Sequence, residues 1–197
     1  MTYKLPKEKD LATYTPSDDL IAASEMSQAL GRPLLLSGKP GTGKTQFAWW
    51  LARKLSEGKA DPFVFNTKST STYTDLFYRY DAVSHFRSKD AGKTTGDFIE
   101  LTALGKAIVC ASQNKNYSPE MQLIIDKCMT PSTQAKSVVL IDEVDKAPRD
   151  FPNDLLHEIE NLSFTIKEIS NEPITLTDDE KQNISIVLTS NFEKSLP

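Results

Sequence analysis

Two stretches of this chain combine residue types that suit phosphate chemistry, and the first is the run GKPGTGKT at residues 38–45. It fits G-x-x-x-x-G-K-[ST], a loop whose glycines let backbone N–H groups point at phosphate oxygens. A helix that starts there adds the partial positive charge of its N-terminus. In this pattern Lys44 reaches the β- and γ-phosphates, and the Thr45 hydroxyl binds Mg²⁺. The run therefore predicts a nucleoside triphosphate site rather than a glycine–proline turn with a chance lysine.

The elements around this loop have the arrangement that the motif needs. A short apolar strand is expected at 33–37, and a helix at 44–55 carries Phe47, Leu51 and Leu55 on one face. The phosphate-binding motif requires a strand, a loop and a helix in this order, because only then can the glycines and the lysine surround a phosphate group. The residues that we expect to bind the nucleotide here are Gly38, Pro40, Gly41, Thr42, Gly43, Lys44, Thr45 and Gln46.

The second stretch is the acidic pair Asp142 and Glu143, which directly follows the apolar run 138–141. Asp142 is placed to hold Mg²⁺ opposite Thr45, directly or through a water. Glu143 is then the candidate general base that orients and polarises the attacking water. Alone, such a pair also fits a solvated strand end. The phosphate loop upstream favours the catalytic interpretation.

A third polar group, Thr189-Ser190-Asn191, directly follows the last apolar strand of the sequence. The neutral amide of Asn191 can hydrogen-bond the γ-phosphate or the attacking water. In isolation these residues are typical of an ordinary turn. Together with the two preceding motifs they favour a catalytic role, so the candidate catalytic residues are Lys44, Glu143 and Asn191.

The pattern of apolar residues predicts strands that alternate with helices. Such alternation indicates an α/β fold, a three-layer P-loop nucleotidase sandwich around a mostly parallel central sheet. Ligands of these sheets bind beyond the carboxyl ends of the strands, where all the polar groups above lie. The expected strands are 33–37, 62–66, 137–141 and 184–188; the expected helices are 17–30, 44–55, 75–86, 101–111, 121–128 and 151–160; a small hairpin is expected from 164–166 and 174–176.

Length and composition limit the class of protein. The 197 residues suffice for one domain, with 1–13 as a polar, flexible lead. No apolar run approaches the roughly 20 residues that span a bilayer, and no signal peptide is apparent. Cys110 and Cys128 have no metal-binding spacing, which is typical of plain thiols in a reducing cytoplasm. The net charge of −4, with scattered lysines, makes nucleic acid an unlikely main partner.

The three motifs, in this order, resemble those of the AAA+ ring ATPases, and the finer match is to the MoxR-like branch. The segments that carry the resemblance are 32–45, 142–148 (DEVDKAP) and 189–191, the last of which is similar to the sensor-1 segment. The resemblance covers roughly 14–197 and implies the large α/β subdomain of that family. It also implies that Tyr14 lies where the family packs its chain against adenine, and that a helix-2 insertion lies near 86–105.

The resemblance further implies partners. Family members form rings, often hexamers, with ATP at the subunit interfaces, and commonly act as chaperone-like remodellers with von Willebrand factor A-type proteins. In the family the arginine finger and a helical lid domain follow sensor 1, whereas this chain ends at Leu196-Pro197. We therefore expect a large subdomain truncated after sensor 1, without the C-terminal lid.

Two main hypotheses follow. In the first, the chain is the ATP-hydrolysing module of a ring-forming cytoplasmic remodeller, with ATP and Mg²⁺ as cofactors. In the second, it is a nucleotide-dependent switch or scaffold that scarcely hydrolyses ATP, because an arginine finger contributes about 10³–10⁵ in rate in other nucleotidases. A P-loop kinase is a weaker third hypothesis, since the sequence indicates no acceptor pocket or mobile lid. No Asn-Lys-x-Asp pattern for guanine occurs, which favours ATP.

Overall fold

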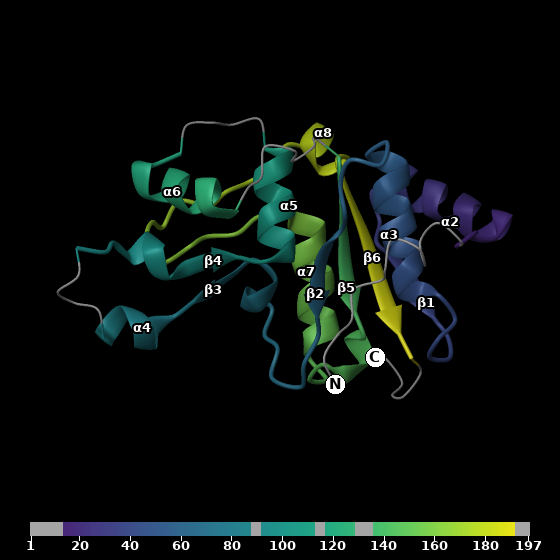
Figure 1. Cartoon of the computed structure of the whole chain (residues 1–197), viewed down its shortest axis with the longest axis horizontal. Helices are drawn as coiled ribbons and strands as arrows, with labels where there is room; N and C mark the ends of the chain where they lie inside the picture. Colours follow the sequence, from purple (N-terminus) through teal and green to yellow (C-terminus); the bar gives the residue numbers. More distant parts are fainter. Residues whose placement is uncertain (1–13, 88–91, 113–116, 129–135, 192–197) are drawn as a thin grey trace.

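The computed structural model describes residues 14–87, 92–112, 117–128 and 136–191, and Figure 1 shows them as an α/β sandwich. The predicted parallel sheet is confirmed. The expected lead at 1–13 and the end of the chain from residue 192 lie outside the described residues. The sheet has four parallel strands, in the spatial order β1 (Leu34–Ser37), β6 (Ile184–Ser190), β5 (Ser137–Asp142) and β2 (Phe63–Asn66).

The strands end level with one another at one edge of the sheet. Ser37 of β1 is in register with Ser190 of β6, and Asn66 of β2 is in register with Asp142 of β5. Because all strands run in the same direction, the segments that follow them leave the sheet side by side. The phosphate loop, the acidic pair and residues 189–191 therefore meet at this edge.

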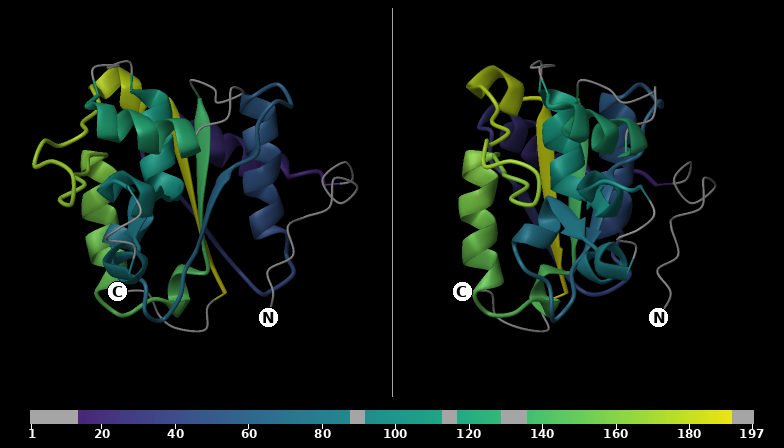
Figure 2. Two further views of the ribbon diagram at one scale, coloured as in Figure 1. Left: turned by 60° about the vertical axis from the view of Figure 1, so that its left-hand side comes forward. Right: turned by 90° about the vertical axis from the view of Figure 1, so that its left-hand side faces the viewer.

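Helices cover both faces of the sheet, which gives the predicted three layers (Figure 2). α2 (Asp18–Ala29) and α3 (Lys44–Leu55) lie on one face. α5 (Ala103–Ala111) and α7 (Phe151–Asn161) lie on the other. The strand β5 between them is covered on both sides, as its continuous apolar sequence predicted.

The side chains of β5 alternate between two apolar clusters. Val138 and Leu140 pack with Phe47 of α3, whereas Val139 and Ile141 belong to the larger cluster under α5 and α7. All four strand residues are buried. Burial of a Val, Leu or Ile side chain contributes about 1.5–3 kcal/mol, so the acidic pair that follows is attached to a firmly held strand.

The first helix begins and ends where its sequence predicted. The Ser17 hydroxyl accepts a hydrogen bond of 3.3 Å from the Leu20 N–H and caps α2. Asp18 and Asp19 follow in the first turn, where negative charge is favourable. Gly31 has φ +60°, a left-handed conformation that ends the helical segment.

The helix expected at 75–86 is wrong. The structure has a 3₁₀ turn, Thr74–Leu76, then strand β3 (Tyr78–Tyr80) and a short helix α4 (Ala82–Arg87). β3 pairs antiparallel with β4 (Ile99–Leu101), away from the main sheet. Aromatic residues favour strands, and pairing with a distant partner outweighs the helical spacing of this segment. The resulting β3–α4–β4 unit overlaps the expected insertion at 86–105.

The β3–β4 pair is fixed to the sandwich through the start of α5. The Thr102 N–H donates to the Phe77 carbonyl at 2.9 Å, and the Thr102 hydroxyl donates to the Asp75 carbonyl at 2.8 Å. A Cβ on Gly105 would lie 2.0 Å from the Phe77 carbonyl oxygen. Only glycine permits this approach. α5 begins at 103 rather than at the expected 101, because Leu101 is paired with Tyr78 in the β3–β4 pair.

Among the remaining elements, α6 (Pro119–Cys128) begins two residues before the helix predicted at 121–128, and the others are short elements that were not predicted from the sequence. They are the 3₁₀ turns Thr95–Phe98 and Val144–Lys146, and the helix α8 (Asp178–Lys181). The hairpin expected at 164–176 is a single antiparallel bridge between Phe164 and Ile174, with reciprocal hydrogen bonds of 3.1 and 2.8 Å. In the described part of the chain, no helix has the length and apolar character needed to cross a membrane.

Cys110 has the properties of an unreactive thiol, as the sequence predicted. It is half-buried and forms no disulfide within the described residues, and burial raises the pKa of its thiol to about 12. The thiolate is the nucleophilic form of cysteine. Cys110 is therefore not a nucleophile at neutral pH.

Candidate nucleotide site

The loop after β1 has the backbone that its glycines predicted. Gly41 and Gly43 have φ of +81° and +86°, in the left-handed region that favours glycine. The Gly38 N–H donates to the Ser190 carbonyl of β6 at 3.2 Å, which extends the pairing of the two strands into the loop. The Thr42 hydroxyl donates to the Lys39 carbonyl at 3.0 Å. The loop is thus closed on itself, and α3 starts directly after Gly43.

The ammonium group of Lys44 lies inside this loop. Its Nζ donates to the carbonyl oxygens of Gly38 and Lys39, at 2.9 and 3.0 Å. These two bonds hold a positive charge at the N-terminus of α3, where the helix dipole also favours an anion. The arrangement has the charge and the donors that a phosphate group needs.

Thr45 and Asp142 meet across the loop, as the sequence predicted. The Thr45 hydroxyl lies 3.1 and 3.3 Å from the two carboxylate oxygens of Asp142, which is only 5% exposed. The Thr189 hydroxyl also donates to Asp142 and accepts the Glu143 N–H at 2.9 Å. Carboxylate and hydroxyl oxygens are the hard ligands that Mg²⁺ prefers, so this pair fits the metal.

Glu143 has a strained backbone and two partners for its side chain. Its φ and ψ are +57° and +52°, a left-handed conformation that is uncommon for a residue with a side chain. One carboxylate oxygen accepts from the Asn191 amide at 3.1 Å, and the other accepts from the Lys146 ammonium. Strain of this kind is often found at functional sites and costs of order 1–3 kcal/mol.

A buried aspartate, Asp145, holds the backbone of Asn191. Its Oδ1 accepts the Asn191 backbone N–H at 3.0 Å, and the residue is only 3% exposed. Among the described residues, its Oδ2 has no hydrogen-bond partner. Sequence reasoning did not single out Asp145, Lys146 or Thr189 as site residues, although all three lie within the quoted motifs. Their contacts with Glu143, Asn191 and Asp142 identify them as positioning residues.

These groups surround one cavity of about 330 Å³ at the carboxyl edge of the sheet. Nearly all the residues predicted from the sequence are present there. Gly38 and Thr42 belong to the loop but not to the lining. The lining residues are Pro40, Gly41, Gly43, Lys44, Thr45, Gln46, Asp142, Glu143, Thr189 and Asn191.

Tyr14 lies beside this cavity rather than in it. It lines an adjoining hollow of about 340 Å³ with Leu20 and the loop residues Thr42, Gly43 and Lys44. Its ring is so close to the loop that a Cβ on Gly43 would lie 2.9 Å from it. Burial raises the pKa of the Tyr14 hydroxyl, so the side chain is neutral near pH 7.

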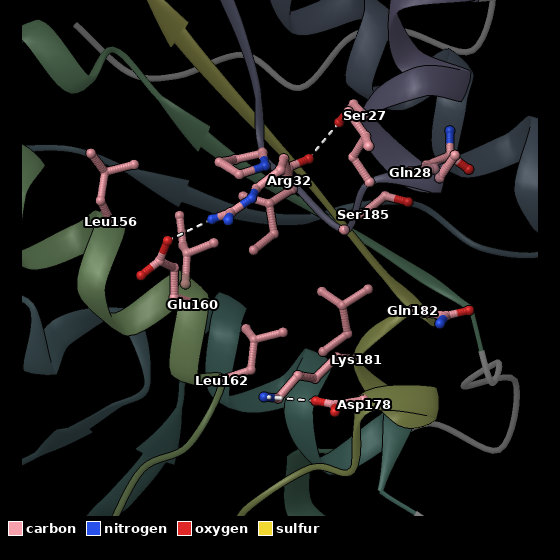
Figure 3. A pocket seen from close by; sticks show the side chains of 17 residues that line it. Ser27, Gln28, Arg32, Leu156, Glu160, Leu162, Asp178, Lys181, Gln182 and Ser185 are labelled. Carbon is pink, nitrogen blue, oxygen red and sulfur yellow. Dashed lines mark hydrogen bonds and ion pairs between the residues drawn. The ribbon is translucent and has the colours of Figure 1, made fainter.

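A larger hollow, of about 510 Å³, opens at the amino ends of β1 and β6. Figure 3 shows its ion pairs, between Arg32 and Glu160 and between Lys181 and Asp178. It has neither a glycine loop nor a buried carboxylate. Volume alone therefore does not select the candidate nucleotide site, which we place at the other edge because the predicted polar groups converge there.

Within the described residues, no group of three or more His, Cys, Asp or Glu side chains is arranged to hold a metal ion. Asp142 and Thr45 alone supply two ligands. This number suits Mg²⁺, which is usually held by one or two carboxylates, waters and the phosphates of its substrate. A metal at this site would thus depend on the nucleotide.

Comparison with known proteins places the chain in a family. A solved structure of C. elegans PCH-2 aligns with 22% identity and a TM-score of 0.39, over 91% of this chain and 37% of that chain. The chain thus spans less than half of the length of that protein. No curated protein sequence matches significantly. The family model for the AAA domain of the dynein-related subfamily matches residues 33–195. The chain therefore belongs to the AAA family and is a nucleotide-binding AAA+ module.

Proposed function

We propose that the chain binds ATP with Mg²⁺ and hydrolyses it, as the module of a ring-forming, chaperone-like remodeller of the MoxR-like branch. One observation carries the proposal. Lys44, the Thr45–Asp142 pair and the Glu143–Asn191 pair, which come from three distant parts of the sequence, line a single cavity of about 330 Å³. A phosphate-binding loop, a metal pair and a water-activating pair together suit triphosphate hydrolysis.

Each residue has a role in this proposal. Lys44 and the loop N–H groups bind the phosphates, and Thr45 and Asp142 hold Mg²⁺, which when bound neutralises charge on the phosphate oxygens. Glu143 accepts a proton from the attacking water, and Asn191 fixes the orientation of the Glu143 carboxylate. Asp145 holds the Asn191 backbone and Thr189 holds Asp142, so both act through other residues.

The alternative, a switch that binds ATP but scarcely hydrolyses it, has an observation in its favour. Among the described residues no arginine lines the cavity. An arginine supplied to the transition state contributes about 10³–10⁵ in rate in other nucleotidases. Lys146 also occupies one oxygen of Glu143. Fast hydrolysis would therefore require an arginine from elsewhere, for example from a second copy in a ring.

Calorimetric titration with ATP and Mg²⁺, followed by phosphate release over a range of protein concentrations, separates the two functions. We expect binding by the wild-type chain and by Glu143→Gln, with turnover lost in the variant. Turnover that rises steeply with protein concentration would support assembly. Equal turnover of the two proteins would remove Glu143 from its role, and binding without turnover at every concentration would favour the switch.

The remaining proposals rest on the resemblance alone. They are a hexameric ring, a von Willebrand factor A-type partner and a cytoplasmic location. Mass measurement of the protein with ATP and Mg²⁺ tests the ring. A monomer under all nucleotide conditions would argue against it.

A further inference from the structure

The flank of the sheet formed by β2 offers unpaired backbone groups. In the described part of the chain, β2 pairs only with β5. The Thr67 N–H donates to the Asp142 carbonyl at 3.1 Å. This bond shows which residues of β2 direct their backbone groups toward β5. Because alternate residues face opposite edges, Phe65 directs its backbone groups to β5, whereas Val64 and Asn66 direct theirs outward. An edge of this kind is a template for another strand.

A groove of about 520 Å³ runs beside that edge. One wall is the edge itself, 62–66, with Trp49 of α3. The other wall is formed by β3, β4 and the first turn of α5, which lie next to β2 in Figure 1. The groove is therefore bounded by elements that are packed into the fold.

Three cations line this groove. They are Lys68, Arg79 and Lys106, and none of them forms an ion pair within the described part of the chain. The only acid in the lining is Glu100, which lies opposite Arg79 in the β3–β4 register. Lys106 is half-buried. The whole chain has a net charge of −4, so the excess of positive charge in this groove is opposite in sign to the net charge of the chain.

Trp49, which lines the same groove, has a buried donor without a partner among the described residues. The residue is only 5% exposed, and its indole N–H has no hydrogen-bond partner among the described residues. Buried indole N–H groups usually have a partner. The groove thus combines an open strand edge, a tryptophan with an unpaired indole N–H and three cations against a single acid, Glu100.

We propose that this groove binds an extended, acidic peptide segment of a partner protein, as an added strand on β2. The backbone of the segment pairs with Val64 and Asn66, and its carboxylates pair with Lys68, Arg79 and Lys106. A strand edge alternates N–H and C=O groups along its length, which a peptide backbone matches. A chain of phosphate groups fits this edge less well than a peptide, because its anionic oxygens would face the outward carbonyl oxygens of β2. Four residues of β2 accommodate a segment of about 13 Å.

The test uses a fluorescein-labelled octapeptide of alternating glutamate and threonine, with fluorescence anisotropy as the measurement. The variant Arg79→Glu/Lys106→Glu should weaken binding about tenfold or more, because like charges then face each other. Lys68→Glu, at an exposed residue, provides a second variant that should not disturb folding. The matched control is Arg32→Glu at the hollow of Figure 3, which should bind the peptide like wild type. Unchanged ATP binding verifies that each variant is folded.

Further binding measurements distinguish an acidic peptide from other possible ligands of the groove. A lysine–threonine octapeptide should not bind, and a glutamate–threonine octapeptide that is N-methylated at every residue, and so has no backbone N–H to donate, should bind at least several-fold more weakly. Equal binding of either peptide, or unchanged binding by the charge-reversed variants, would overturn the proposal. Tighter binding of a single-stranded oligonucleotide at the same salt concentration would assign the groove to nucleic acid instead. Self-association that the octapeptide displaces would assign it to a second copy. None of these results depends on ATP hydrolysis.

Discussion

The two hollows at opposite ends of β1 and β6 differ in how their polar groups are held. At the carboxyl ends, Asp142 is 5% exposed and receives hydroxyl hydrogen bonds from Thr45 and Thr189. At the amino ends, the side chains of Arg32 and Glu160 pair while they are 63% and 60% exposed. Exposed pairs of this kind contribute about 0–1 kcal/mol. The polar groups of the smaller hollow are therefore held in a fixed arrangement, whereas those of the larger hollow are ordinary exposed surface groups.

Among the variants that test this comparison, Lys44→Ala is expected to cause the largest change, a loss of ATP affinity. The variant removes the cation that lies within the loop, so ATP affinity should fall about 100-fold or more, since charge-assisted hydrogen bonds contribute about 1.5–3 kcal/mol each. Calorimetric titration measures the change. Lys39→Ala, in the same loop but exposed, is the matched control and should change affinity less than threefold, about 0.7 kcal/mol. Equal loss in both variants would contradict the assigned role of Lys44.

Asp142→Asn is expected to remove the contribution of Mg²⁺ to ATP binding. The amide keeps one oxygen for the Thr45 hydroxyl but loses the negative charge, so the gain in affinity from Mg²⁺ should fall about tenfold, or roughly 1.4 kcal/mol. Titrations with Mg²⁺ and with EDTA give the difference. Asp178→Asn, whose carboxylate is 98% exposed at the other hollow, is the control. A full magnesium effect in Asp142→Asn would show that the metal lies elsewhere.

Glu143→Asn should remove turnover and yet stabilise the fold. Asparagine tolerates the left-handed conformation better than glutamate, so unfolding should cost about 0.5–1 kcal/mol more, a rise in melting temperature of roughly 1–4 °C. Glu57 has φ +53° and is not among the residues that line the cavity. Glu57→Asn should therefore give the same rise in melting temperature with unchanged turnover. A destabilised Glu143→Asn would mean that the Asn191 and Lys146 contacts outweigh the backbone strain.

The sequence predicted which polar residues meet at the carboxyl edge of the sheet, because each part of the candidate site is local. The glycines of the loop, the apolar run before Asp142 and the strand before Asn191 each determine their own conformation. Parallel strands then bring them together. The β3–β4 pair was not predictable in this way, because Tyr78–Tyr80 becomes a strand only through its partner Ile99–Leu101. The groove beside β2 likewise joins cations from three separate segments.

The smallest effect is expected at the larger hollow. Glu160→Ala breaks the pair with Arg32, but both side chains stay in water, so the free energy of unfolding should change by less than about 0.5 kcal/mol. ATP affinity should not change, because the altered residue is at the opposite ends of the strands. Urea unfolding and calorimetric titration of the same preparation measure the two quantities. A marked loss of ATP affinity would show that the two ends of the sheet are coupled, and the contrast between a fixed site and a surface would no longer hold.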